Sequence, residues 1–162
     1  MKTRIKVTPV VYLILLRQDQ ILLMRRFQTG YYDGYYSVCS GHLEGEESLT
    51  LAMIREAEEE IGLKLEPSDV KLVHSMHRIE HETDGSISER LDFFFVATLP
   101  ATSSTVEPIN VEPDKCDQLC WVKLDELPDK MIPYVRAAIK CYSDGVQYSE
   151  YGWSEFDLPT SS

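Results

Sequence analysis

The sequence predicts an α/β fold, because strand-like apolar runs are mixed with two helical segments that lie far apart along the chain. The chain has 162 residues, of which 43% are hydrophobic and 27% are charged, as in an ordinary globular protein. This length suits one domain with a sizeable core. We therefore expect a single domain over residues 1–162, built as an α/β sandwich.

The first elements predict a β-hairpin. Residues 7–16 are rich in apolar and β-branched side chains, residues 18–20 form a polar turn, and residues 21–26 return as a second strand. The basic start of the chain imitates a signal peptide, but no small-residue cleavage site follows the apolar run at residues 10–16. The run is also far too short to span a membrane. We expect it to form a buried strand.

Loops and further strands follow along the chain. Residues 28–36 contain two glycines and four tyrosines, which predicts a loop, and residues 36–39 predict a short strand. The same apolar patterning predicts later strands at residues 70–77, 91–98 and 119–122. The polar segments 81–89 and 100–117 predict loops between them.

Two helices are expected. Ser48 is a suitable N-cap for a helix over residues 49–61, and Gly62 is a suitable C-terminal stop. Residues 132–142 predict the last helix, since Pro133 is tolerated in a first turn. The aromatic tail at residues 148–156 is expected to pack back on the domain.

The charge balance restricts the partners. Sixteen basic and 27 acidic residues give a net charge of -11, which repels a phosphate backbone, so we expect no large nucleic acid as partner. A small phosphorylated substrate remains compatible, because bound divalent cations reverse the local sign. Solubility alone would also explain the acidity.

The cysteine pattern favours free thiols. Cys39, Cys116, Cys120 and Cys141 form no CxxC pair, and no histidine lies at zinc-like spacing. Free thiols are typical of a reducing compartment, so we expect a cytoplasmic protein without a membrane segment.

Three glutamates of the first predicted helix share one face. Glu56, Glu59 and Glu60 are i, i+3 and i+4 neighbours, which places them within an arc of about 100°, while Glu58 projects into solvent. Carboxylate oxygens are the ligands that Mg²⁺ and Mn²⁺ prefer, so the face could hold one or more ions. Taken alone, this run would be better explained as a charged helix surface.

The residues around these glutamates follow a defined spacing. Residues 41–63 read Gly, five residues, Glu47, seven residues, then Arg-Glu-Ala-Glu-Glu-Glu-Ile-Gly-Leu. This segment resembles the Nudix box at every defined position, with the small Ala57 in an aliphatic position as a mild departure. The order of the predicted elements resembles Nudix proteins along essentially the whole chain. The resemblance implies a Nudix-type α/β/α sandwich around a mixed β-sheet.

The resemblance also implies roles for individual residues. Glu59 and Glu60 would be the main metal ligands, and Glu56 would be a third ligand or the base that activates water. A main-chain carbonyl near Ser40 or Gly41 would be a further ligand, since Gly41 lets the loop approach the metal. Arg55 and Glu47 would form an ion pair that orients the helix carboxylates. A packing role is favoured for Cys39 over a nucleophilic one.

The implied activity is a divalent-metal-dependent pyrophosphohydrolase with Mg²⁺, or Mn²⁺, as cofactor. Residues 77–82 contain neither the proline typical of ADP-ribose enzymes nor the tyrosine typical of dinucleoside-polyphosphate enzymes. By elimination, the expected enzyme is MutT-like and cleaves a (d)NTP to NMP and pyrophosphate. The alternative within this class is hydrolysis of ADP-ribose or another nucleoside diphosphate derivative.

Other candidate residues lie outside the box. Arg25 and Arg26 resemble basic residues that meet substrate phosphates in MutT-like enzymes, although a solubilising role at the strand end is equally compatible. Glu112 is favoured over Glu107 and Asp117 as an additional acid of the metal site. Asp129 is a loose match for a residue that reads the base. The tyrosines at 31, 32, 35 and 36 and Trp153 could stack on a base, but packing is the favoured role.

Two readings of a different class stay open. Residues 37–42 faintly resemble the cysteine region of isopentenyl diphosphate isomerases, which usually have a degraded box. Non-catalytic nucleotide-sensing modules commonly lose box glutamates, and all are present here. The intact box therefore favours a hydrolase that acts on a small nucleotide-type substrate, as a monomer or a homodimer.

Overall fold

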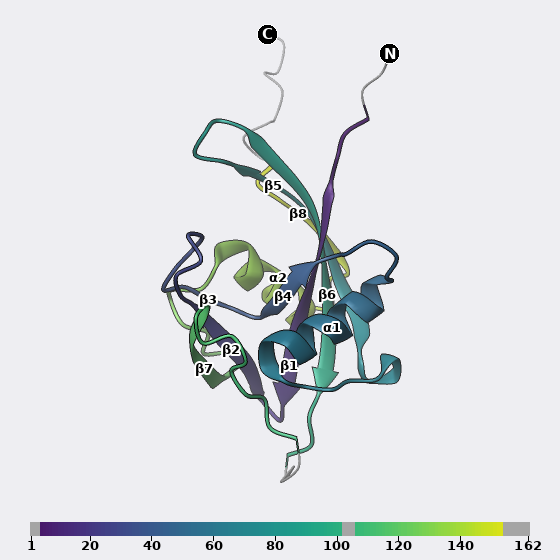
Figure 1. Ribbon diagram of the computed structural model, residues 1–162, viewed down its shortest axis with the longest axis vertical. Coiled ribbons are helices and arrows are strands. Elements are labelled where there is room, and N and C mark those ends of the chain that lie inside the picture. Colours follow the sequence, from purple (N-terminus) through teal and green to yellow (C-terminus); the bar gives the residue numbers. More distant parts are fainter. Residues whose placement is uncertain (1–3, 102–105, 154–162) are drawn as a thin grey trace.

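The computed structural model describes residues 4–101 and 106–153, which form a mixed sheet with helices on both faces (Figure 1). The helices are α1 (Leu49–Ile61) and α2 (Pro133–Ser143), with a 3-10 turn η1 (Pro67–Asp69). The strands, in chain order, are β1 (Thr8–Arg17), β2 (Gln20–Arg26), β3 (Tyr36–Ser37), β4 (Cys39–His42), β5 (Lys71–His81), β6 (Ile87–Thr98), β7 (Cys116–Lys123) and β8 (Tyr148–Tyr151).

The sheet is mixed because two of its strand pairs are parallel. The order is β3-β2-β1-β6-β5-β8, with β4 paired to β1 and β7 paired to β2. The pairs β1–β6 and β5–β8 are parallel, and the others are antiparallel. Strand β1 pairs with β4 along its first half and with β2 only at its end. The box therefore starts beside the central strand of the sheet.

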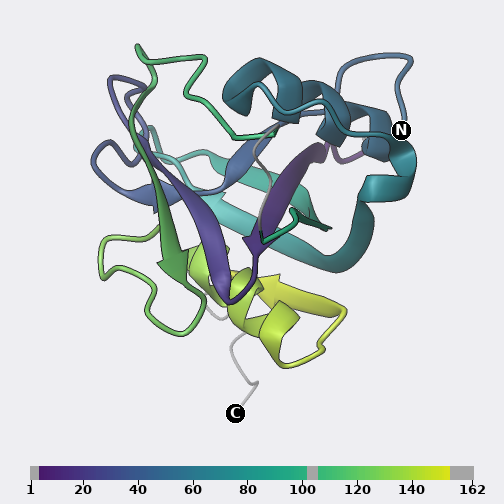
Figure 2. The same ribbon diagram turned by 90° about the horizontal axis from the view of Figure 1, so that it is seen from below.

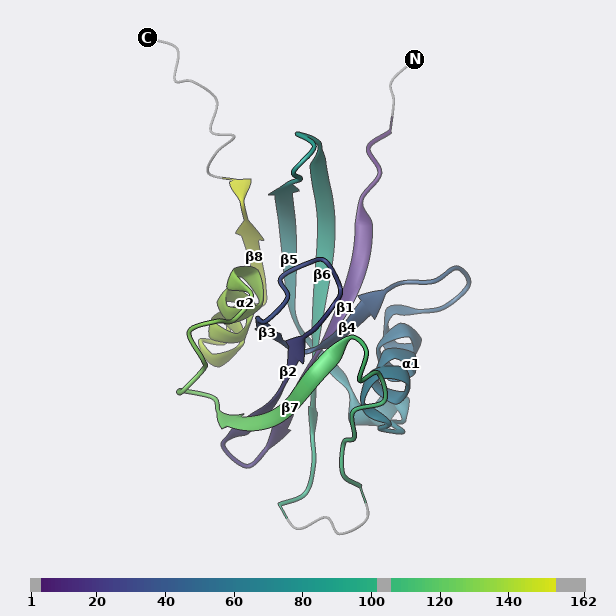
Figure 3. The same cartoon turned by 60° about the vertical axis from the view of Figure 1, so that its left-hand side comes forward.

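Side chains of β1 alternate between two hydrophobic cores, as expected for a strand that is covered on both faces. Val11, Leu13 and Leu15 pack with Ala52, Met53, Ala57 and Ile61 of α1. Val10, Tyr12 and Ile14 pack with Tyr134, Val135, Ala138 and Ile139 of α2. Figure 2 and Figure 3 show the two helices on opposite sides of the sheet. The predicted α/β/α sandwich is confirmed.

Helix α1 has the predicted bounds and caps. The side chain of Ser48 accepts a hydrogen bond from the backbone N–H of Leu51 at 3.2 Å, which satisfies one of the free donors of the first turn. Gly62 ends the helix with a φ of 64°, a left-handed conformation that glycine adopts without a Cβ penalty. The helix that carries the glutamates is therefore fixed at both ends.

Three predicted boundaries were wrong. The loop expected over 81–89 is shorter, because β5 and β6 extend as a hairpin to His81 and from Ile87. The strand expected over 36–39 is split into β3 and β4, which pair with different neighbours, β2 and β1. Strand β7 begins at Cys116, inside the segment expected to be a loop.

The remaining predictions about the chain agree with the described residues. The tail packs back as expected: β8 pairs with β5, and the indole N–H of Trp153 donates to the His77 carbonyl at 3.0 Å. Residues 154–156 of that expected segment lie outside the described residues. All four cysteines lie within the described part and are unbonded thiols. Within the described ranges, no helix combines the length and apolarity that crossing a membrane requires.

Candidate functional site

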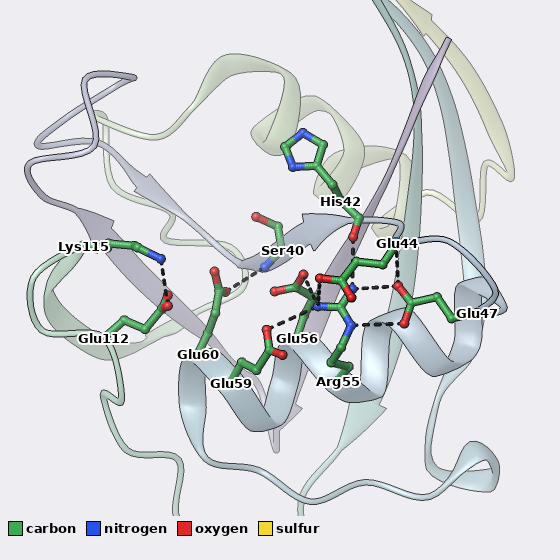
Figure 4. Close-up of polar contacts among 10 residues, drawn as sticks. All are labelled: Ser40, His42, Glu44, Glu47, Arg55, Glu56, Glu59, Glu60, Glu112 and Lys115. Carbon is green, nitrogen blue, oxygen red and sulfur yellow. Dashed lines mark hydrogen bonds and ion pairs between the residues drawn. The ribbon is translucent and has the colours of Figure 1, made fainter. Parts of the chain in front are cut away.

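The glutamate face of α1 lies against strand β4, at the start of the box. In Figure 4, Glu56, Glu59 and Glu60 follow one another along the helix beneath Ser40 and His42 of β4. The helical spacing predicted that the three carboxylates share a face. The contact with β4 is tertiary and brings the main chain of the box next to them. The three carboxylates and the neighbouring main-chain carbonyls offer hard oxygen donors at this place.

Arg55 is the centre of the ion-pair network. Its Nε and Nη2 donate to the two carboxylate oxygens of Glu47 at 3.1 and 2.7 Å. Its Nη1 donates to Glu56 at 2.8 Å and to Glu59 at 3.2 Å, and Nη2 also reaches the His42 carbonyl at 3.1 Å. The Arg55 guanidinium and the N–H of Glu44 hold the pKa of Glu47 below its ordinary value. Glu47 and Arg55 therefore pair as the resemblance implied.

Gly41 makes room for Glu56. An added Cβ at Gly41 would overlap the Glu56 carboxylate, so only glycine lets that side chain lie against the β4 backbone. Burial raises the pKa of Glu56, and the Arg55 guanidinium acts in the opposite direction. The carboxylate is thus held in a confined place by one cation and the glycine backbone.

Glu60, like Glu56, is half-buried, and desolvation acts on it more strongly. Its Oε2 accepts a hydrogen bond from the backbone N–H of Ser40 at 3.0 Å. Burial raises the pKa of Glu60 to about 7, against the smaller opposing effects of the Ser40 and Cys39 hydrogen bonds. Among the described residues Glu60 forms no ion pair. A buried carboxylate without a counter-charge is favourable only if it is protonated or neutralised by a cation.

Glu59 and Glu58 are almost equally exposed but pair with different cations. The side chain of Glu59 is 54% exposed and bonds to Arg55, whereas Glu58 points to Lys64, with 3.7 Å between Oε1 and Nζ. Glu58 is 56% exposed, so it belongs to the solvated surface of α1. Glu59 is therefore the accessible member of the cluster, and Glu60 the enclosed one.

Glu112 reaches the cluster from a loop that is attached to the end of α1. The N–H groups of Ile109 and Val111 donate to the carbonyls of Ile61 and Glu60 at 3.0 and 3.2 Å. These bonds satisfy carbonyls that the last helical turn leaves free. Glu112 then lines a cavity together with Glu60 and bonds to Lys115 at 2.8 Å.

The two other acids considered with Glu112 are engaged elsewhere. Glu107 pairs with Arg17, with 2.9 Å between the nearest oxygen and nitrogen. Asp117 accepts two hydrogen bonds from Arg25, at 2.7 and 2.9 Å. Of the three candidates, Glu112 is therefore the one beside the glutamates of α1.

A cavity of about 400 Å³ adjoins the carboxylates. Its lining comprises Glu60, Glu112, Lys115, Arg25, Arg26, Ser40 and neighbours on β2 and in the following loop. Arg25 is bound to Asp117, across the β2–β7 pair. Arg26 donates to the Tyr31 carbonyl at 2.7 Å and to Thr29 at 3.0 Å, so it stabilises the loop at residues 28–36. Both arginines face the cavity, each with an additional structural role.

The remaining predicted residues, apart from Asp129, have packing roles in this structure. Asp129 is exposed. Tyr31, Tyr32 and Tyr35 pack edge to face with one another, and the indole of Trp153 lies 4.6 Å from the His77 ring. Of this set, Tyr31 also lines a cavity beside Gly41. Packing was the role favoured by the sequence.

Lys115, His42 and Arg90 line the cavities around the carboxylates and were not singled out in the sequence. Lys115 lies in a loop that approaches the cluster only through the fold. Arg90 and His42 meet because β4 and β6 are both neighbours of β1. His42 is inside the box, which was the available sequence clue.

The donor set fits a hard divalent cation. Glu56, Glu59, Glu60 and Glu112 supply only oxygen, which Mg²⁺ and Mn²⁺ prefer, and Gly41 keeps backbone and carboxylate adjacent. Within the described ranges, no three acidic, imidazole or thiol side chains are already clustered as metal ligands. Arg55 draws Glu56 and Glu59 to itself, and the Ser40 N–H holds Glu60. Metal binding would therefore require these side chains to shift.

Comparison with known proteins places this site in a wider context. The model of the NUDIX domain family matches residues 6–141, which include all of α1. A MutT NUDIX hydrolase from Burkholderia pseudomallei is 26% identical, with 83% of this chain and 97% of that chain covered and a TM-score of 0.71.

Two further structures share the fold. A mutator MutT protein from Bacillus halodurans is 23% identical over 95% of each chain, with a TM-score of 0.69. A bifunctional NMN adenylyltransferase/ADP ribose pyrophosphatase from Francisella tularensis is 16% identical, with a TM-score of 0.66; 86% of this chain and 41% of that chain are covered. At these identities the two likenesses concern the fold alone.

Proposed function

This chain belongs to the NUDIX domain family, whose model matches residues 6–141, and from that membership we propose a divalent-metal-dependent pyrophosphohydrolase that cleaves a (d)NTP to NMP and pyrophosphate. The family and the similarity to a MutT NUDIX hydrolase support a hydrolase of pyrophosphate bonds. The choice of a (d)NTP as substrate is our proposal. It rests on the absence of the ADP-ribose and dinucleoside-polyphosphate markers from residues 77–82.

The observation that carries the proposal is the convergence of α1, β4 and the Glu112 loop on one cavity. Glu60 is desolvated and has no direct ion pair among the described residues, and it lies next to a cavity that can admit a phosphorylated ligand. Glu56 and Glu59 lie on the same helix face, and Glu112 lies across the cavity from α1. A charged helix surface, the simpler explanation, would leave these side chains in solvent. Glu58 is in that situation, whereas Glu56 and Glu60 lie against β4, and Glu59, which is about as exposed as Glu58, bonds to Arg55.

We assign roles to the residues of this chain accordingly. Glu56, Glu59, Glu60 and Glu112, with a main-chain carbonyl near Ser40 or Gly41, would hold Mg²⁺ or Mn²⁺. The bound cation neutralises diphosphate oxygens and lowers the pKa of a water molecule. Glu56 is confined between Gly41 and Arg55, and its raised pKa suits a group that accepts a proton from water. Arg55 and Glu47 keep the carboxylates oriented, and Arg25 or Arg26 meets substrate phosphates from β2.

A screen of product release tests the proposal. Wild type and Glu59→Gln are compared with Mg²⁺ on (d)NTPs, oxidised dGTP, ADP-ribose and dinucleoside polyphosphates. We expect the highest kcat/KM on a (d)NTP, with NMP and pyrophosphate as products. The substitution should lower turnover at least about tenfold while the fold stays intact, because it removes a charged ligand. Hydrolysis of ADP-ribose alone would overturn the substrate assignment. Inactivity on the whole panel would overturn the hydrolase assignment for these substrates and favour a sensing or isomerase role.

A further inference from the structure

A second cavity, of about 380 Å³, is lined in part by Ser40, Gly41 and His42 of strand β4. It is lined by residues from five strands and by Tyr134 of α2, and it shares Arg26 and Ser40 with the first cavity. We propose that this second cavity is an anion-binding subsite, in which Arg90 contacts the third phosphate group of a triphosphate substrate. This inference rests on the proposed function and adds a specificity residue to it.

Basic side chains from separate strands converge on the second cavity. Arg26 comes from β2, His42 from β4, Arg78 from β5 and Arg90 from β6. Arg78 and Arg90 are direct partners across the β5–β6 pair. Like charges directly opposite each other destabilise a sheet unless they are neutralised. Three of these four side chains, the arginines, carry a charge that a nearby anion, from the protein or from a ligand, can compensate.

Arg78 has its compensating anions in the protein. Its Nε donates to Asp92 at 2.6 Å, its Nη1 donates to Glu80 at 2.8 Å, and its guanidinium lies 3.7 Å from the centre of the Tyr134 ring. The side chain of Arg78 is 2% exposed. It therefore forms the fixed floor of the cavity.

Arg90 lacks such a direct carboxylate partner among the described residues, although it lies near enough to Asp92 to act against the rise in that carboxyl's pKa. Within the part of the chain that the structure describes, its guanidinium forms no ion pair with a carboxylate, and its polar partner is Nε2 of His42 at 3.1 Å. That nitrogen must accept the bond, so His42 is neutral in this arrangement. Arg26 also donates only to uncharged oxygens, those of Tyr31 and Thr29. The acid on the lining, Glu82, is exposed.

His42 connects this subsite to the glutamate cluster. Its carbonyl oxygen accepts a hydrogen bond from Arg55, while its imidazole bonds to Arg90, and Figure 4 shows the imidazole pointing away from the glutamates. Ser40 lines both cavities and bonds to Glu60. A phosphate chain that starts at the carboxylates can therefore continue past β4 to Arg90. A guanidinium presents forked donors that match phosphate oxygens, and a neutral sugar would not compensate its charge.

The first test compares a triphosphate with the diphosphate of the same nucleoside, which lacks only the third phosphate. We expect Arg90→Gln to lower the ratio of their kcat/KM values at least about tenfold, mainly through the KM of the triphosphate, because a charge-assisted bond to phosphate is lost. Arg90→Lys should restore part of the ratio. The control Lys71→Gln removes one charge at the exposed far end of β5 and should keep the ratio. A ratio in Arg90→Gln within twofold of wild type would overturn the subsite.

The second test needs no catalysis. Binding of inorganic tripolyphosphate is measured by calorimetry in EDTA, and we expect at least about tenfold weaker binding in Arg90→Gln than in wild type or Lys71→Gln. Equal binding in all three proteins would contradict the subsite. If wild type hydrolyses no substrate but binds tripolyphosphate through Arg90, the proposed function fails and the subsite stands. If triphosphates are hydrolysed and Arg90→Gln has no effect in either test, the proposed function stands and the subsite fails.

Discussion

The guanidinium of Arg55 binds both carboxylate oxygens of Glu47, with Nη2 2.7 Å from Oε1 and Nε 3.1 Å from Oε2. This fork leaves Nη1 directed at Glu56 and Glu59. Arg55 thus holds the middle of α1 to the box loop and contacts two of the candidate metal ligands.

Replacing Arg55 by lysine tests whether activity depends on its bonds to Glu47, Glu56 and Glu59. Lysine keeps the charge but cannot bind Glu47 with two parallel bonds while also reaching Glu56 and Glu59. We expect kcat to fall at least about tenfold, since small displacements of catalytic groups are costly, with a smaller change in KM. Steady-state kinetics with circular dichroism as a check of folding would measure this. Wild-type kcat in Arg55→Lys would show that the fork has no orienting role.

Substitution of Gly41 by alanine should displace Glu56 without unfolding the protein. The new Cβ overlaps the end of a flexible side chain, which can move, and Gly41 has no positive φ that would strain an alanine. We expect a large loss of kcat and a melting temperature close to wild type. Gly45→Ala is the matched control, because nothing lies within 4 Å of its Cβ position. Equal activity of the two variants would mean that the fit of Glu56 against Gly41 is unimportant.

The burial of Glu60 predicts an unusual dependence of stability on pH in metal-free protein. The folded-state pKa of about 7 lies above the ordinary carboxyl value, so the folded protein binds more protons than the unfolded one between these values. The stability associated with Glu60 is therefore fully present below the unfolded pKa, and it is lost as the pH rises through 7.

Thermal unfolding in EDTA between pH 4.5 and 8 tests this expectation. Wild type should lose stability relative to Glu60→Gln as the pH rises, because glutamine never acquires the buried charge. Added Mg²⁺ should reverse the loss in wild type, since a cation neutralises the carboxylate. Parallel pH profiles for the two proteins in EDTA would contradict the burial argument.

Substitution of Gly62 tests whether the loop that carries Glu112 depends on its contact with the end of α1. The φ of Gly62 is +64°, and the side chain of Ile109 lies 2.8 Å from the Cβ that alanine would add. Gly62→Ala should cost about 1–2 kcal/mol for the left-handed conformation and should also displace the loop and lower activity. Gly145→Ala has a similar φ of +72° but open space around its Cβ position, so it should be destabilised without loss of activity. Equal activities would show that Glu112 does not depend on this contact.

The sequence was informative where structure depends on local patterns. The caps and the glutamate face of α1 follow from residue spacing along one helix, and the burial of β1 on both faces follows from its continuous apolar run. The β5–β6 hairpin was placed too short, because its outer residues His81 and Ile87 are exposed and do not show the burial pattern of a sheet interior. Without that pattern, a polar strand resembles a loop.

The tertiary contacts of the site could not be predicted in the same way. The bond from Ser40 to Glu60 and the approach of Glu112 depend on how β4 and a later loop pack against α1. The meeting of Arg90 with His42 depends on strand order, because both strands neighbour β1. Such contacts between distant segments leave no periodic trace in a single sequence.

Metal binding by the glutamates of α1 is the central claim, and it can be measured directly with Mn²⁺ by electron paramagnetic resonance. Glu59→Gln should bind Mn²⁺ at least about tenfold more weakly than wild type, because a charged oxygen ligand is lost. Glu58→Gln is the matched control one position earlier on the helix, and its affinity should stay within twofold of wild type, because Glu58 points to Lys64. Equal Mn²⁺ affinity in wild type, Glu58→Gln and Glu59→Gln would contradict the assignment of the metal site.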